Sequence, residues 1–405
     1  MTAEAPRAGF TLAERDRRWA RLRALMAPQE MAFLVVLPDR QLPGDARYVA
    51  LRLGAVVFPL EGEPTFLSPW TGRLTASNPW IADARPATAT GTTAVPYGEA
   101  VGRRLRELDV GRRRVGLAGL SGTPLGPVRN PEGYAKHTAV EHIRAAVPQA
   151  TLVDASALLA EARYVKSEEE IGALRRAVAA GEAGAPALAA SARPGVTAAE
   201  AFGATILAQY RAGAEDTEVA WGGGPWGEAK ERTTTVPPGV LQPGWAIKTE
   251  MFPSVLGYQA QIAQPVFVGP PPADAQALCE LGQAAFERAR AAMRPGATWC
   301  EVEEQARAVA RGGAYEIEFL CHGRGLGDDG PMFIPMDDHT RHPLWEAPLL
   351  ENTAFVLKPY AYRPDRGRDD WTNPKTVTWG DTVVVRAGGA ERLGTRPYAL
   401  LSSEG

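Results

Sequence analysis

Lys358 lies at the end of an apolar run, and this position makes it a candidate for chemistry. The run A-F-V-L at 354–357 comes directly before it, and Pro359 follows. Four apolar residues and a proline are typical of a buried strand that stops there. Burying an ammonium costs several kcal/mol unless an anion meets it. We therefore expect Lys358 to pair with a buried carboxylate or to act in a reaction, unless its stem packs while its head reaches solvent.

Two other segments place polar residues where a core would prefer apolar ones. Glu250 lies in one expected strand and Gln261 in the next, on either side of a turn at 253–257. His322 follows an apolar pair and precedes a glycine-rich loop, and that loop carries Arg324, Asp328 and Asp329. A histidine can exchange protons near neutral pH, and an arginine can bind a carboxylate through two hydrogen bonds.

The composition places limits on the class of protein. The chain has 405 residues, of which 45% are hydrophobic and 22% charged, as in a globular protein long enough for two domains. A net charge of −3 gives no sign of nucleic-acid or acidic-membrane binding. Three widely spaced cysteines fit neither a disulfide framework nor a metal clip. With no secretory signal and no run long enough to span a bilayer, we expect a cytoplasmic protein.

Two domains are predicted from the order of the elements. Residues 1–160 alternate expected helices and strands, which indicates a small α/β domain. Near residue 160 the pattern changes to a long helix, whose start is marked by Ser167 and Glu170 at capping-box spacing. We place the second domain at 161–405.

The second domain contains an internal repeat. The pattern R-P-G-x-T-x-x-E occurs at 193–200 and again at 294–301. In each copy Pro-Gly ends one helix and Thr with Glu begins the next, and strands follow. One copy alone would be an ordinary helix connector, but two copies in matching places favour a duplicated α+β domain.

Taken together, these segments resemble the pita-bread superfamily of creatinase and the methionine and Xaa-Pro aminopeptidases. The segment "RYVKSEEEI" is similar to its linker helix, "HGRGLGDDGP" to its Gly-His-Gly-x-Gly-Leu loop, and "GDTVVVRAGGAERL" to its closing segment. The motifs occur in the family's order and cover nearly the whole chain. The resemblance implies a creatinase-type α/β N-terminal domain followed by a pseudo-twofold, duplicated α+β domain.

The metal ligands of the peptidase members do not carry over. Those members hold two divalent metals with two Asp, one His and two Glu. The corresponding positions here are Glu250, Gln261, His322, Lys358 and Gly380. A lysine in this cluster would repel a metal ion, so we expect no metal and no other cofactor. The hypothesis is that the Lys358 ammonium takes over the electrostatic role of the metals and neutralises Glu250.

The remaining polar groups suggest a different chemistry, and their residue types indicate the roles. The expected catalytic residues are His322 as general acid or base, Lys358 as a charged group, base or amine nucleophile, and Glu250 as its partner. The expected substrate-binding residues are Arg324, Tyr258, Gln261 and Asp329. His322 could instead be a hydrogen-bonded remnant of the metal site, and Arg324 a solvated loop residue.

Three functions remain open. The leading hypothesis is a metal-independent enzyme that cleaves a C–N or related bond in a small carboxylate-bearing molecule, such as an amidino or N-acyl amino acid. The second is a pita-bread binding protein without chemistry, and the third is an Xaa-Pro metallo-aminopeptidase. Resemblance to creatinase-type proteins also implies a homodimer, with Arg47 and Arg52 as candidates to reach the partner's pocket.

Overall fold

The protein folds into two compact units, residues 1–164 and 165–405. This computed structural model describes residues 9–68, 78–87, 95–126, 131–333, 342–369, 371, 373 and 375–403. No helix within these ranges is long and apolar enough to cross a membrane.

The first unit is built on one mixed sheet of six strands in the order β4-β3-β2-β1-β5-β6. The β1–β2 and β2–β3 pairs are antiparallel, and the other three pairs are parallel. The strands are β1 (Met31–Val36), β2 (Ala55–Pro59), β3 (Thr65–Ser68), β4 (Asp83–Pro86), β5 (Arg114–Leu117) and β6 (Thr151–Asp154). The helices are α1 (Leu12–Met26), η1 (Ala27–Gln29), α2 (Gly44–Ala50), α3 (Tyr97–Glu107), α4 (His137–Ala146) and α5 (Ser156–Tyr164).

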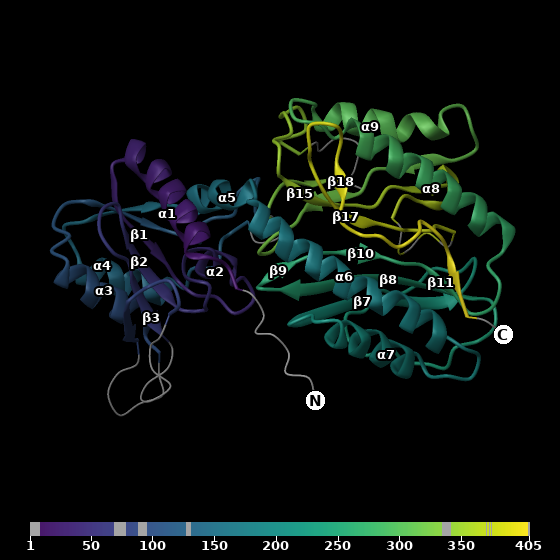
Figure 1. The fold of residues 1–405 in the computed structure, drawn as a ribbon, viewed down its shortest axis with the longest axis horizontal. Coiled ribbons are helices and arrows are strands. Elements are labelled where there is room, and N and C mark those ends of the chain that lie inside the picture. The colour runs from purple at the N-terminus through teal and green to yellow at the C-terminus, as the bar shows by residue number, and fades with distance from the viewer. Residues whose placement is uncertain are drawn as a thin grey trace. The chain divides into compact units, whose positions relative to one another are not determined.

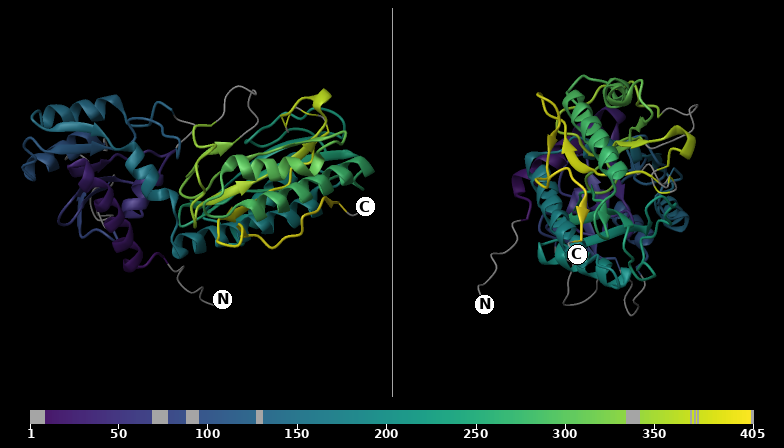
Figure 2. Two further views of the ribbon diagram at one scale, coloured as in Figure 1. Left: turned by 90° about the horizontal axis from the view of Figure 1, so that it is seen from above. Right: turned by 90° about the vertical axis from the view of Figure 1, so that its right-hand side faces the viewer.

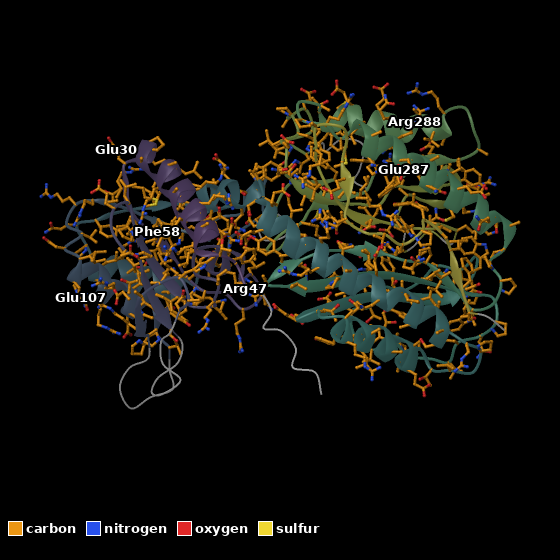
Figure 3. All side chains as sticks on the ribbon, in the orientation of Figure 1. Glu30, Arg47, Phe58, Glu107, Glu287 and Arg288 are labelled. Atoms are coloured by element: carbon orange, nitrogen blue, oxygen red, sulfur yellow. The ribbon has the colours of Figure 1, made fainter. Side chains whose placement is uncertain are left out.

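The core of this unit lies between the sheet and the pair α3 and α4. Val35 and Val57 from the strands pack with Leu105 of α3 and Ile143 of α4, and all four are buried. The side chain of Phe58 lies inside the unit, whereas Arg47 of α2 is only partly buried (Figure 3). Two buried faces of apolar residues therefore hold α3 and α4 to the sheet.

In the described residues of the second unit there are two larger sheets and one two-stranded ribbon. One sheet is made of β7 (Asp216–Pro225), β8 (Trp245–Val255), β9 (Tyr258–Gln259), β10 (Ile262–Ala263), β11 (Val266–Phe267) and β19 (Leu401–Ser402). The other follows the order β14 (Met332–Phe333), β13 (Cys321–Gly323), β15 (Ala354–Leu357), β17 (Asp381–Val384) and β18 (Glu391–Arg392). The ribbon pairs β12 (Glu316–Glu318) with β16 (Tyr360–Tyr362). Strands β7–β11 of one larger sheet and β15, β17 and β18 of the other are labelled in Figure 1.

The helices of this unit come in two pairs. They are α6 (Glu168–Ser191) with α7 (Ala198–Arg211), and α8 (Ala273–Ala292) with α9 (Trp299–Arg307), followed by the short turns η3 (Ala308–Ala310) and η4 (Pro364–Arg366). The helix α6 packs on β8, α7 on β7 and α8 on β16. Seen from above, the long helices lie alongside the strands (Figure 2).

The internal repeat predicted from the sequence is confirmed. Thr197 and Glu200 form a capping box at the start of α7, and Thr298 and Glu301 form the same box at the start of α9. The glycine before each box has a positive φ, 84° at Gly195 and 86° at the matching position, which a residue with a side chain rarely adopts. Each copy of the motif therefore forms the same glycine turn and the same helix cap.

The two sheets are joined where the candidate site lies. Ala263 and Gly380 form an isolated antiparallel bridge, with N···O distances of 3.0 and 3.2 Å. The buried guanidinium of Arg396 donates to both carbonyls and also to Asp381, at 3.1 Å. The backbone on either side of the bridge is therefore fixed from the first sheet to the second.

Candidate active site

Lys358 is buried, and the anion that meets it is Glu250. Its backbone N–H donates to the carbonyl of Leu320 at 2.8 Å, just beyond the end of β15. Only 2% of its surface is exposed, and its ammonium donates a hydrogen bond to Glu250 Oε1. The alternative in which the head of Lys358 reaches solvent is therefore not what the structure shows.

Glu250 faces the site because of strand alternation in β8. Neighbouring residues Met251 and Pro253 belong to the face that packs on glycines of α6: Gly184 lies under the Met251 sulfur and Gly181 under the Pro253 ring. Successive side chains of a strand point to opposite faces, so Glu250 points away from α6. Burial alone would raise the pKa of Glu250, but the nearby Lys358 ammonium outweighs it and the pKa is lowered. The carboxylate is thus ionised at neutral pH.

His322 lies opposite Val356 in the ladder between β13 and β15. It is 2% exposed, and its Nδ1 lies 3.2 Å from Asp328 Oδ1. Burial lowers the pKa of His322 to about 4, although the Asp328 carboxylate opposes this shift. The imidazole is therefore neutral at pH 7. This corrects the expectation that His322 titrates near neutral pH, because a buried imidazole loses the hydration that favours its charged form.

Arg324 is buried as well and is held by amide side chains. Its Nη2 donates to Gln261 Oε1 at 2.6 Å and its Nη1 to Gln259 Oε1 at 3.0 Å. Asp328 Oδ1 lies 3.3 Å from the same Nη1, and the guanidinium stacks over the Phe252 ring at 5.5 Å from its centre. Arg324 is therefore an ordered cation inside the site and not a solvated loop residue.

Tyr258 and Asp329 are buried in contacts that support the site from outside. The Tyr258 hydroxyl donates to Glu170, the acidic member of the capping box at the start of α6. Asp329 accepts the backbone N–H of Leu326 at 2.9 Å and lies 3.4 Å from the Lys166 ammonium. The described contacts tie Tyr258 to α6 and Asp329 to its own loop and to Lys166, and the expected role of both residues in binding substrate stays a prediction.

Besides Gln259, two residues were missed by sequence reasoning: Arg232, which lies beside Glu250, and Trp371, which lies beside Arg232. Arg232 Nη2 lies 3.5 Å from Glu250 Oε2, and its guanidinium lies over the Trp371 ring at 5.5 Å from the ring centre. The link between β7 and β8 brings Arg232 there, and the only signal in the sequence was a charged segment between two strands. Nothing near Trp371 in the sequence pointed to it.

The residues at this site do not fit the metal pair that the resemblance implies. Among the described residues, no group of three or more His, Cys, Asp or Glu side chains could hold a metal ion. The Lys358 ammonium already binds the Glu250 carboxylate, and the Arg324 guanidinium binds the Gln261 oxygen. Two fixed cations would repel a divalent ion, and lysine and arginine offer no lone pair to it.

Comparisons with known proteins agree with the fold. The model of metallopeptidase family M24 matches residues 172–387. The crystal structure of X-Pro aminopeptidase from Thermotoga maritima MSB8 is similar with a TM-score of 0.73 and 19% identity, over 95% of this chain and 99% of that one. Xaa-Pro dipeptidase from Bacillus anthracis gives 0.70 and 18%, over 96% and 99%.

Dipeptidase PepE from Mycobacterium ulcerans gives a TM-score of 0.68 and 22% identity, over 98% of this chain and 99% of that one. No curated protein sequence matches. The expected architecture, an α/β domain followed by a duplicated pita-bread domain, is confirmed over nearly the full length.

Proposed function

We propose, from the premise that this chain belongs to metallopeptidase family M24, that it is an enzyme which cleaves a C–N bond of a small carboxylate-bearing molecule without a metal ion. The observation that carries the proposal is the buried pair of Lys358 and Glu250. A fixed ammonium supplies positive charge where the family's metal-binding members hold their ions. Positive charge at the reacting group is what such a site contributes to acyl transfer.

The charges around the pair favour an anionic substrate. In the described contacts of the site, the cations Lys358, Arg324 and Arg232 lie near the carboxylates of Glu250 and Asp328. With His322 neutral, these five groups carry three positive and two negative charges. An N-acyl amino acid, which carries a carboxylate and no cation, suits this balance better than an amidino compound with a positive group.

The proposed reaction is hydrolysis. Water attacks the acyl carbon, the C–N bond breaks, and the proton passes from water through His322 to the leaving nitrogen. A neutral imidazole can accept that proton, and the Asp328 carboxylate 3.2 Å from Nδ1 would stabilise the imidazolium that forms. Lys358 and Arg324 would stabilise the negative charge that develops on the acyl oxygen.

A second candidate is an Xaa-Pro metallopeptidase, favoured by the structural similarity to the X-Pro aminopeptidase over 95% of this chain. It requires bound metal, so the metal content of the purified protein by mass spectrometry separates the two. Substoichiometric metal together with hydrolysis of N-acyl amino acids supports the metal-free enzyme. Two metal ions per chain and cleavage of Xaa-Pro dipeptides would contradict it.

Single substitutions test the assignment of the site. His322→Gln, Lys358→Met and Glu250→Gln should each abolish turnover in the metal-free enzyme, and unchanged activity in all three would overturn the proposal. Substrate binding without any product would instead indicate a binding protein. We further propose that the protein is a homodimer, which light scattering on the purified protein would test. We also propose that it lies in the cytoplasm.

A further inference from the structure

Arg232 differs from the other cations of the site because it is partly exposed. Its side chain is 41% exposed, whereas the side chains of Lys358 and Arg324 are each 3% exposed. One of its nitrogens nevertheless lies 3.5 Å from the buried Glu250 Oε2. Arg232 is therefore accessible from solvent and at the same time lies next to the buried Glu250 carboxylate.

The Trp371 ring gives this arginine a fixed surface to lie on. The ring packs on Gly222 of β7, where an added Cβ would lie 2.9 Å from a ring carbon. The Trp371 backbone accepts a hydrogen bond from Lys230 N–H at 3.2 Å, two residues before Arg232, and its own N–H donates to Asp369 at 2.9 Å. The hydrogen bond between Lys230 and Trp371 thus keeps the backbone near Arg232 beside the backbone of Trp371.

Of the two ion pairs described for Glu250, the one with Arg232 is the weaker. An ion pair at 3.5 Å with one exposed partner is weak, because water screens the charges and fixing the side chain costs entropy. Lys358, in contrast, binds the other oxygen of Glu250 within the buried interior. Arg232 can therefore change its partner at little cost, and a carboxylate arriving from solvent offers it two parallel hydrogen bonds.

We propose that Arg232, supported by Trp371, captures the substrate's carboxylate at the exposed edge of the site and so frees Glu250 Oε2 to accept an N–H of the same molecule. This deepens the proposed function, on whose site it rests. It assigns the substrate class as an N-acyl amino acid with an unsubstituted amide N–H. Lys358 keeps Glu250 charged when Arg232 leaves it.

Three small probes separate the two contacts. N-acetylglycine carries both the carboxylate and the N–H, N-acetylglycinamide lacks the carboxylate, and N-acetylsarcosine lacks the N–H. Binding to the full chain is measured by isothermal titration calorimetry, which needs no turnover. We expect N-acetylglycine to bind at least about tenfold more tightly than N-acetylglycinamide and several-fold more tightly than N-acetylsarcosine.

Arg232→Gln should remove the preference for acid over amide, and Arg232→Lys should restore only part of it because lysine cannot form the paired bonds. Trp371→Leu should weaken acid binding, while Trp371→Phe keeps an aromatic surface. Arg311→Gln is the matched control, since Arg311 is 71% exposed and pairs only with exposed Glu304 among its described contacts. It should leave all three affinities unchanged.

The inference and the proposed function fail in different ways. If Arg232 serves only to balance Glu250, Arg232→Gln would alter stability but leave the acid-to-amide ratio as in the wild type, and the inference would be wrong. Absence of any acid preference in the wild type would also overturn it. Acid-selective, Arg232-dependent binding without product formation would uphold the inference while contradicting the proposed reaction.

Discussion

Lys358 occupies the space that a side chain at residue 380 would need. A Cβ added to Gly380 would lie 2.1 Å from Lys358 Cγ and 2.8 Å from the Leu357 carbonyl oxygen. By the resemblance of the closing segment, we expect this glycine to stand where the family has its last metal-binding glutamate. A glutamate there and the inward-pointing Lys358 thus exclude each other. The glycine at 380 and the lysine at 358, which both differ from the metal-binding pattern, therefore depend on each other.

Gly380→Ala should therefore displace Lys358 from Glu250. We expect it to lower the free energy of unfolding by about 1–3 kcal/mol, the usual cost of overpacking, and to reduce turnover or probe binding. Gly172→Ala is the matched control, because a Cβ at this position of α6 meets nothing within 4 Å. It should be neutral or slightly stabilising. Equal urea unfolding curves for the two variants would contradict the proposed exclusion.

Lys358→Met should destabilise the protein by about 3–5 kcal/mol at pH 7, because it leaves a buried carboxylate without its main cation. Adding Glu250→Gln should recover most of that loss, since the uncompensated charge is then gone. Urea unfolding of the four members of this double-mutant cycle gives the coupling energy. Additive losses in the double variant would mean that the two side chains do not depend on each other.

The features that depend on local chemistry were predictable from the sequence. The two R-P-G-x-T-x-x-E copies specify their own turns and capping boxes, and both are present. The contact of Lys358 with Glu250 was also accessible, because a lysine in a buried strand needs an anion and the resemblance indicated which one. That these residues act in catalysis stays a prediction.

The features that depend on tertiary packing were not predictable. Gln259 and Gln261 became partners of Arg324 only through the meeting of two sheets. Trp371 and Arg232 come from separate segments whose approach has no periodic signal. The neutral state of His322 follows from complete burial, which a histidine beside a glycine-rich loop does not reveal.

The pKa of His322 gives a stability change with a definite sign. The folded protein protonates this imidazole only near pH 4, whereas the unfolded chain does so near its ordinary value of 6.5. Between these values the unfolded state binds more protons, so the contribution of His322 is complete above pH 6.5 and is lost as the pH falls toward 4. The shift corresponds to roughly 3 kcal/mol.

His322→Gln removes this titration. The difference in unfolding free energy between wild type and His322→Gln should therefore change by roughly 3 kcal/mol between pH 7 and pH 4, with the wild type losing more. Urea unfolding at several pH values measures it. A difference that stays constant with pH would show that the imidazole is protonated alike in the folded and unfolded chain.

Divalent metal ions should not stabilise this protein. A native-state ligand present at a thousand times its dissociation constant adds about 4 kcal/mol, which would raise the melting temperature by several degrees. Because Lys358 and Arg324 already occupy the oxygens of Glu250 and Gln261, we expect no rise with about 1 mM Mn²⁺, Co²⁺ or Zn²⁺ and no fall with a chelator. Lys358→Glu exchanges the ammonium for a possible ligand, so the same metals should stabilise this variant more than the wild type. A rise in the wild type itself would mean that the cations leave the site when metal is offered.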